Sequence, residues 1–128
     1  MARILIIDDD EQVRSVLQIM LVRAGYEVVS AANGKQGIRI FNENPTDLVI
    51  TDILMPVMPG SRLISILRKD HPNVKIIAIS GGGSMNQPGS YLTLASDLGA
   101  QQILTKPVKF VDLIAAVEDT LADLYTSG

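Results

Sequence analysis

Residues 4–11, near the start of the chain, read ILIIDDDE. The apolar half of this stretch, Ile4 to Ile7, runs without a break into four acids: Asp8, Asp9, Asp10 and Glu11. An uninterrupted apolar run is typical of a strand that is buried on both faces of a parallel sheet. Adjacent carboxylates repel one another and are rarely buried without a partner. The stretch therefore predicts an inner strand with acids at its carboxyl end, and it raises the question of what neutralises them.

Four further runs rich in Ile and Val follow the same pattern and are predicted to be strands. They occupy residues 26–31, 47–52, 74–80 and 101–106. Segments with helical spacing of apolar residues separate and follow the strands. The predicted helices cover residues 13–24, 35–42, 61–70, 90–98 and 108–124. This alternation predicts an α/β fold, a doubly wound five-stranded parallel sheet in a flavodoxin-like (βα)5 sandwich.

Several residues mark the expected helix ends. Asp10 is expected to cap the first helix, and Gly25 to end it. Asn33, Ser61 and Ser90 are expected to cap later helices. The buried stripe of the first helix is predicted from apolar residues at helical spacing: Val13, Val16, Leu17, Met20, Leu21 and Ala24.

Length and composition favour one compact domain, which we expect to cover residues 1–128 with a frayed tail at 125–128. Hydrophobic residues make up 47% of the chain and charged residues 20%, values typical of globular proteins. There is no cysteine, no apolar run long enough to span a membrane, and no stretch typical of a signal peptide. These features predict a cytoplasmic protein. A net charge of −3 and scattered basic residues argue against direct binding of nucleic acid or of a membrane.

Chemically reactive residues follow the predicted strands at their carboxyl ends, which meet at one edge of a parallel sheet. The set comprises Asp8 and Asp9 after the first strand, Asp52 at the end of the third, Ser80 at the end of the fourth, and Lys106 at the end of the fifth. Clustered carboxylates need a cation, and an all-oxygen set suits Mg2+. Asp52 precedes a turn rich in Pro and Gly, so its carboxylate could attack a phosphoryl group there. Lys106 and Ser80 could then contact the phosphoryl oxygens.

The ordered set resembles the receiver domain of two-component response regulators, including the single-domain regulator of chemotaxis. The matching motifs are the acid pair at Asp8 and Asp9, D-x-x-M-P-x-x-x-G from Asp52, S-G from Ser80, and K-P from Lys106. The resemblance implies that Asp52 is the phosphoacceptor, that Asp9 and Asp52 bind Mg2+ directly, and that Asp8 acts mainly through water. It further implies that the Leu54 backbone carbonyl is a metal ligand, that Ser80 and Lys106 contact the phosphoryl group, and that the Lys106–Pro107 bond is cis.

In this interpretation the domain accepts a phosphoryl group from a sensor histidine kinase or a histidine phosphotransfer protein. It is not a conventional enzyme, although it catalyses its own aspartyl phosphorylation and dephosphorylation. The expected output is altered binding of a downstream protein, with a phosphorylation-dependent homodimer as one form.

Three positions depart from the family pattern. Ile103 stands where an aromatic switch residue is common, Pro59 replaces a common acidic residue before the loop glycine, and the loop Gly81 to Gly89 is glycine-rich. We therefore expect the signal to leave through ordering of residues 81–98, not through a rotating ring. His71 is interpreted as an exposed turn residue without a role.

Two alternatives use the same residues differently. A haloacid-dehalogenase-like phosphohydrolase would use Asp8 as nucleophile and Asp10 as a second acid two residues later. That class expects Thr or Val two residues beyond the second acid, where this chain has Gln12. That class would also need an acidic pair on a later strand, where this chain offers Asp112 and Glu118 on a helix. The second alternative is a pseudo-receiver, an interaction module that keeps the fold without the chemistry.

Overall fold

The computed structural model describes residues 2–81, 97 and 99–126, with side chains as far as residue 122. Its five strands form one parallel sheet in the order β2-β1-β3-β4-β5. They are β1 (Arg3–Ile7), β2 (Glu27–Ala31), β3 (Leu48–Asp52), β4 (Ile76–Ser80) and β5 (Gln102–Thr105). The strand order reverses between β1 and β3, which is where doubly wound sheets bind their ligands. The predicted fold class is confirmed.

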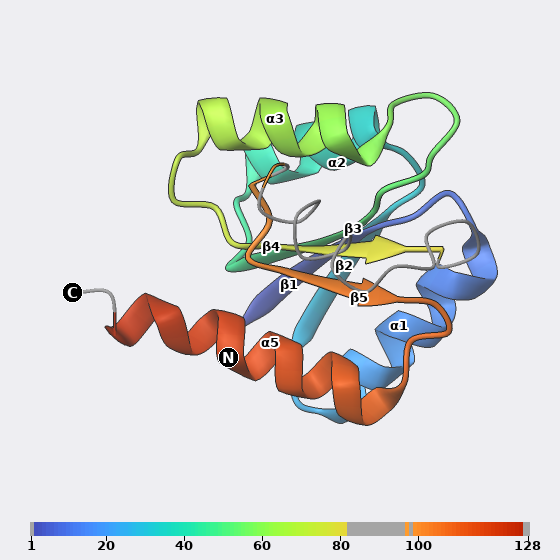
Figure 1. Cartoon of the computed structure of the whole chain (residues 1–128), viewed down its shortest axis with the longest axis vertical. Coiled ribbons are helices and arrows are strands. Elements are labelled where there is room, and N and C mark those ends of the chain that lie inside the picture. Colours follow the sequence, from blue (N-terminus) through green and yellow to red (C-terminus); the bar gives the residue numbers. More distant parts are fainter. Residues whose placement is uncertain (1, 82–96, 98, 127–128) are drawn as a thin grey trace.

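Helices cover both faces of the sheet, as Figure 1 shows. On one face lie α2 (Gly34–Glu43) and α3 (Gly60–Asp70), and on the other α1 (Glu11–Arg23) and α5 (Phe110–Thr126). The last helix continues to Thr126, two residues past its expected end. The helix expected at residues 90–98, its cap Ser90 and most of the loop 81–89 lie outside the described residues.

The core consists of two apolar layers, one on each face of the sheet. Leu5 and Ile7 point into one layer with Leu63 of α3, whereas Ile4 and Ile6 point into the other with Leu17 of α1. These four apolar side chains of β1 are fully buried, whereas Arg3 at its start is not. The absence of polar alternation in β1 therefore has a direct cause: each of its faces is covered by helices, and each buried side chain contributes roughly 1.5–3 kcal/mol.

Most of the expected helix ends are confirmed. The Asp10 side chain accepts hydrogen bonds from backbone amides of α1, and Asn33 does the same for α2. Gly25, just beyond α1, has a φ of 97°, a left-handed conformation that glycine adopts without strain. The prediction for Ser61 is wrong, because α3 begins one residue earlier, after Pro59, and has no side-chain cap.

Two further expectations from the sequence are wrong. Val16 does not lie in the buried stripe of α1, since its side chain is 49% exposed while its neighbour Leu17 is buried. His71 is half-buried: its ring packs edge-on against Phe41 at 4.7 Å, and its Nε2 lies 2.8 Å from Oδ1 of Asn42. His71 also ends α3, so it joins the carboxyl ends of α2 and α3.

Candidate functional site

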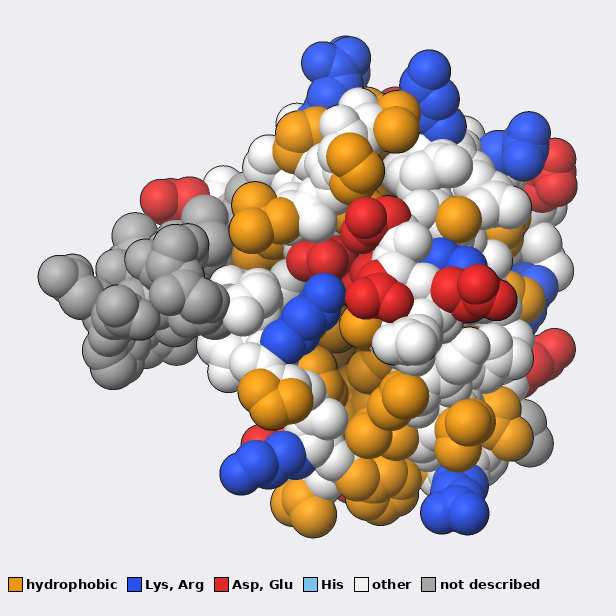
Figure 2. All heavy atoms as spheres, turned by 90° about the vertical axis from the view of Figure 1, so that its right-hand side faces the viewer, with side chains coloured by type: hydrophobic (Ala, Val, Ile, Leu, Met, Phe, Trp, Pro, Cys, Tyr) orange, Lys and Arg blue, Asp and Glu red, His pale blue; other side chains and the backbone are white. Residues whose placement is uncertain are grey.

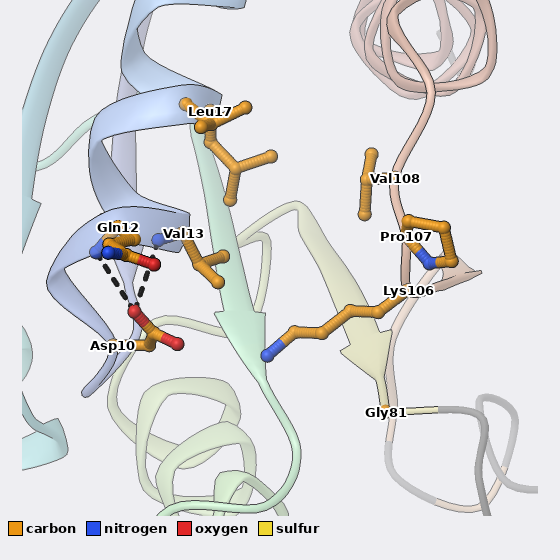
Figure 3. Close-up of a pocket in the computed structure, with 9 residues that line it drawn as sticks. Asp10, Gln12, Val13, Leu17, Gly81, Lys106, Pro107 and Val108 are labelled. Atoms are coloured by element: carbon orange, nitrogen blue, oxygen red, sulfur yellow. Dashed lines mark hydrogen bonds between the residues drawn. The ribbon is translucent and has the colours of Figure 1, made fainter.

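The turn between β1 and α1 carries the first acids of the site. The backbone amide of Asp8 extends the sheet by donating to the Ala31 carbonyl at 3.2 Å. The Asp8 side chain is buried, and its Oδ1 accepts a hydrogen bond from the Asp10 amide at 2.8 Å. Asp9 is exposed. Asp10 points back to cap α1, accepting from the amides of Gln12 (2.9 Å) and Val13 (3.3 Å), as Figure 3 shows. Asp8 and Asp9 thus remain directed to the sheet edge while Asp10 serves the helix.

Asp52 ends β3 and is also buried. Its Oδ1 accepts a hydrogen bond from the Leu54 amide at 3.2 Å. The loop after Asp52 closes on itself through a bond of 2.7 Å from the Gly60 amide to the Ile53 carbonyl. A Cβ at position 60 would lie 2.4 Å from the Asp52 carbonyl oxygen, so only glycine fits. This contact explains why a glycine ends the loop that follows Asp52.

Lys106 reaches the acids from the other side of the edge. Its Nζ lies 3.0 Å from Oδ2 of Asp52 and 3.4 Å from Oδ2 of Asp8. Its backbone amide donates to the Ser80 carbonyl at 2.8 Å, and the cis bond to Pro107 is present as expected. Ser80 is buried at the end of β4. The residues predicted from four separate strand ends are therefore collected at one edge.

The charges at this edge shift the pKa values of two groups. Burial raises the pKa of Asp8, and the nearby Asp52 charge raises it further, against the Asp10 amide and Lys106, which lower it. Burial alone would lower the pKa of Lys106. The hydrogen bond to Asp52 and the charges of Asp52 and Asp8 outweigh burial, so the net pKa of Lys106 is raised. Lys106 stays charged, whereas charging Asp8 costs free energy in this environment.

The acids fit a divalent cation. Carboxylate oxygens of Asp8, Asp9 and Asp52 all lie within 4.8 Å of one another. Within the described part of the chain, Oδ2 of Asp8 is a buried oxygen that no hydrogen bond satisfies. Lys106 offers one positive charge to three carboxylates, so the set remains net negative. Hard oxygen ligands with an excess of negative charge are what Mg2+ and similar ions bind.

Figure 2 looks onto this edge, where acidic side chains gather next to a basic one and apolar side chains cover much of the surface to one side. A groove of about 560 Å³ adjoins the site there. Figure 3 shows its walls: Val13 and Leu17 of α1 face Pro107 and Val108, and the Lys106 side chain crosses the space between them. The site therefore opens beside an apolar surface.

Sequence reasoning missed one residue at the site, Arg14. From the first turns of α1, its Nη1 donates to the backbone carbonyl of Asp8 at 2.7 Å. The available signal was its position, since helical side chains point back toward the helix amino end and Arg14 follows the acid turn by one helical turn. A lone arginine in a helix carries little information without that geometry.

The protein is thus a flavodoxin-like domain with an acid cluster and a lysine at the switch point of its sheet. The response regulator receiver domain model matches residues 4–118, and the chain belongs to this family. The expected family is thereby confirmed.

Relatives and solved structures agree with this assignment. The transcriptional regulatory protein GlrR of Escherichia coli K12 is 34% identical over 94% of this chain and 26% of its own length. PrrA of Mycobacterium tuberculosis is 32% identical over 93% of this chain and 49% of its own. The chain thus spans about a quarter to a half of the length of these relatives.

A response regulator receiver domain protein from Clostridium thermocellum has a TM-score of 0.88, 32% identity and full coverage of both chains. TrrA of Thermotoga maritima, solved with Mg2+ and BeF, has a TM-score of 0.82 and 32% identity, covering 94% of this chain and 99% of that one. Within the ranges that the structure describes, no helix has the length and apolar character needed to cross a bilayer.

Proposed function

We propose that this receiver domain takes a phosphoryl group from a phosphohistidine onto Asp52, in a Mg2+-dependent reaction. The observation that carries the proposal is the position of Lys106, whose Nζ lies 3.0 Å from the Asp52 carboxylate beside the clustered acids. A structural ion pair would need one acid, but here Lys106 contacts both Asp8 and Asp52, and Asp9 adds a third carboxylate to the cluster. Such a surplus of charge favours a site that receives further ligands.

In the proposed reaction a carboxylate oxygen of Asp52 forms a bond to phosphorus. The P–N bond of the donor breaks, and its electron pair returns to the imidazole nitrogen. Lys106, already in contact with Asp52, can donate to a phosphoryl oxygen, and the Ser80 hydroxyl at the neighbouring strand end can donate to another. Asp8, Asp9, Asp52 and the Leu54 carbonyl are the groups proposed to hold the metal. A bound Mg2+ would offset negative charge on the phosphoryl oxygens.

The phosphodonor is proposed to be a sensor histidine kinase or a histidine phosphotransfer protein in the cytoplasm. The apolar groove beside Lys106 supports delivery by a protein, because a partner could bury apolar surface there while its histidine reaches Asp52. The output is proposed to be altered binding of a downstream protein, or self-association of phosphorylated domains. Ile103 is half-buried in β5 against the core, which supports an output that does not depend on a rotating aromatic ring.

The geometry disfavours the hydrolase alternative. That class needs the acid at position 10 free to exchange a proton with substrate, but Asp10 is occupied as the α1 cap. Asp8, its proposed nucleophile, is buried against Lys106 with a raised pKa. Because its side chain caps α1, Asp10 does not present the free acid that a hydrolase of this class requires.

The test uses phosphoramidate, a small donor whose P–N bond resembles that of phosphohistidine, with Mg2+. Tandem mass spectrometry should locate one phosphoryl group on Asp52, and p-nitrophenyl phosphate should not be turned over. Labelling of Asp8 with steady turnover of that ester would establish the hydrolase instead. A chain that takes up no label from phosphoramidate and binds no Mg2+ would be a pseudo-receiver.

A further inference from the structure

The carbonyl of Asp8 accepts a hydrogen bond from a charged side chain that pairs with no carboxylate among the described residues. Arg14 is half-buried, and its Nη1 donates to that carbonyl at 2.7 Å. In the described part of the chain no carboxylate lies within 4.0 Å of its guanidinium, although Asp9, Asp10 and Glu11 are close in sequence. An arginine next to so many acids would ordinarily pair with one. Here it binds the backbone and leaves the carboxylates open.

Apart from the ion pair between Lys106 and Asp8, the other contacts that fix the acid turn are made by the turn itself or by the sheet. The Asp8 amide donates to Ala31, and the Asp10 amide donates to Oδ1 of Asp8. Asp10 in turn caps α1. None of these contacts depends on the side chain at position 14. Arg14 therefore adds a side-chain restraint on the acid turn that comes from within α1. It acts on Asp8, the first residue after β1.

We infer that Arg14 is a positioning residue for the metal site: it holds the Asp8–Asp9 turn with its carboxylates directed at the cation, without occupying them. The inference rests on the proposed function for its use of Mg2+. Groups that orient metal ligands commonly change metal affinity by about 10-fold to 100-fold when removed. Restraint through a backbone carbonyl belongs to the same class of effect, because it limits the positions of both adjoining carboxylates.

The charge of Arg14 acts in the opposite direction, since a guanidinium repels Mg2+. That repulsion is weak at physiological ionic strength, where the screening length is about 8 Å. The positional effect and the charge effect therefore predict opposite signs, and a measurement at that salt concentration distinguishes them. Loss of the restraint should weaken Mg2+ binding, whereas loss of the charge alone should strengthen it.

The experiment measures the Mg2+ dissociation constant by isothermal titration calorimetry in 0.15 M salt for the parent chain and three variants. Arg14→Met, which removes donor and charge, should raise the constant about tenfold. Arg14→Lys, which keeps a charged donor of similar length, should stay within about threefold of the parent. The matched control is Arg23→Met, an exposed arginine in the last turn of the same helix, which should change nothing.

A second readout separates positioning from general damage. Labelling of Asp52 by acetyl phosphate should be slow in Arg14→Met at low Mg2+ and should recover at saturating Mg2+. If Arg14→Met does not fold in a melt with EDTA, Arg14→Ala, which also removes donor and charge, takes its place with the same expected weakening. If the parent binds Mg2+ and Arg14→Met binds it equally well or more tightly, the positioning role of Arg14 is overturned and the proposed function still stands. A parent chain that binds no Mg2+ would overturn the proposed function with it.

Discussion

The Nζ of Lys106 lies 3.0 Å from Oδ2 of Asp52, although 54 positions separate the two residues in the chain. The same nitrogen also lies 3.4 Å from Oδ2 of Asp8, so one lysine bridges acids from two neighbouring strands. Both carboxylates are buried, and part of the lysine is exposed. Among the residues that the structure describes, Lys106 is the cation that pairs with the carboxylates of the metal-free site, so the stability of the site should depend on it.

Replacing Lys106 by Met should destabilise the metal-free protein, because Asp8 and Asp52 would remain buried without a counter-charge. We expect a loss of about 1–2 kcal/mol, less than for a fully buried pair because the lysine is partly solvated. Added Mg2+ should raise the melting temperature more in Lys106→Met than in the parent, since the ion replaces the missing charge. The control is Lys109→Met, an exposed lysine nearby. An equal Mg2+ effect in all three proteins would show that Lys106 does not balance the acids.

Replacing Asp9 by Ala should weaken Mg2+ binding and slow phosphoryl labelling while leaving the fold intact. Asp9 is exposed and contributes an oxygen to the acid cluster, so its removal costs no packing. Without Mg2+ the variant should melt at the same temperature as the parent or slightly higher, because one of three repelling charges is gone. Thermal melts with and without Mg2+ check this, with the exposed Glu11→Ala as control. A metal-induced rise as large as that of the parent would contradict a ligand role for Asp9.

The raised pKa of Asp8 predicts a particular pH dependence. Because the folded metal-free protein holds the Asp8 proton more tightly than the unfolded chain, the stability linked to Asp8 is fully present below its ordinary pKa of 3.8 and falls as pH rises through the raised value. In EDTA at pH 7, Asp8→Asn should therefore melt roughly 2–5 °C above the parent, as ~1 kcal/mol produces in a domain of this size. The difference should shrink as the pH approaches 3.8.

At pH 7, Mg2+ should reverse the order of the two melting temperatures, because the parent binds the ion more tightly than Asp8→Asn does. Melts across pH with EDTA or Mg2+ give both comparisons. A difference that widens as the pH falls would mean that the charged form of Asp8 stabilises the metal-free fold, contrary to this account.

Gly60→Ala should distort the loop between Asp52 and Gly60. The new Cβ would lie 2.4 Å from the Asp52 carbonyl oxygen and 2.6 Å from Cα of Ile53, and backbone atoms cannot step aside as a flexible side chain can. We expect a loss of about 1–3 kcal/mol together with slower labelling of Asp52. Chemical denaturation and labelling rates are the measurements. The adjacent Ser61→Ala, at an exposed position without a capping bond, should behave as the parent. Equal stability of Gly60→Ala and Ser61→Ala would show that the loop is not tightly constrained.

The sheet and most of the site could be predicted from the sequence, because short apolar runs mark the strands and the order of the strands brings their ends together. Uninterrupted apolar runs such as Ile4–Ile7 require burial on both faces, and a parallel sheet then brings the strand ends together. Asp8, Asp52 and Lys106 follow directly from that argument. The cis bond before Pro107, by contrast, was expected only from the family resemblance.

The misses have physical causes. Val16 is apolar and has helical spacing, but it faces the groove beside the site rather than the core. His71 pairs with Asn42 across two helices, a contact between residues distant in sequence that no local pattern reveals. Arg14 donates to a backbone carbonyl, and because every residue has one, the sequence does not show which carbonyl it contacts. Each of these depends on which surfaces meet in three dimensions.

Intact-mass spectrometry after incubation with acetyl phosphate and Mg2+, on the parent and on Asp52→Asn, tests whether Asp52 is the phosphoacceptor. We expect that the parent gains one phosphoryl group, that EDTA prevents the gain, and that Asp52→Asn gains none while folding normally. Undiminished labelling of Asp52→Asn would contradict the account, because the acceptor would then be a different residue.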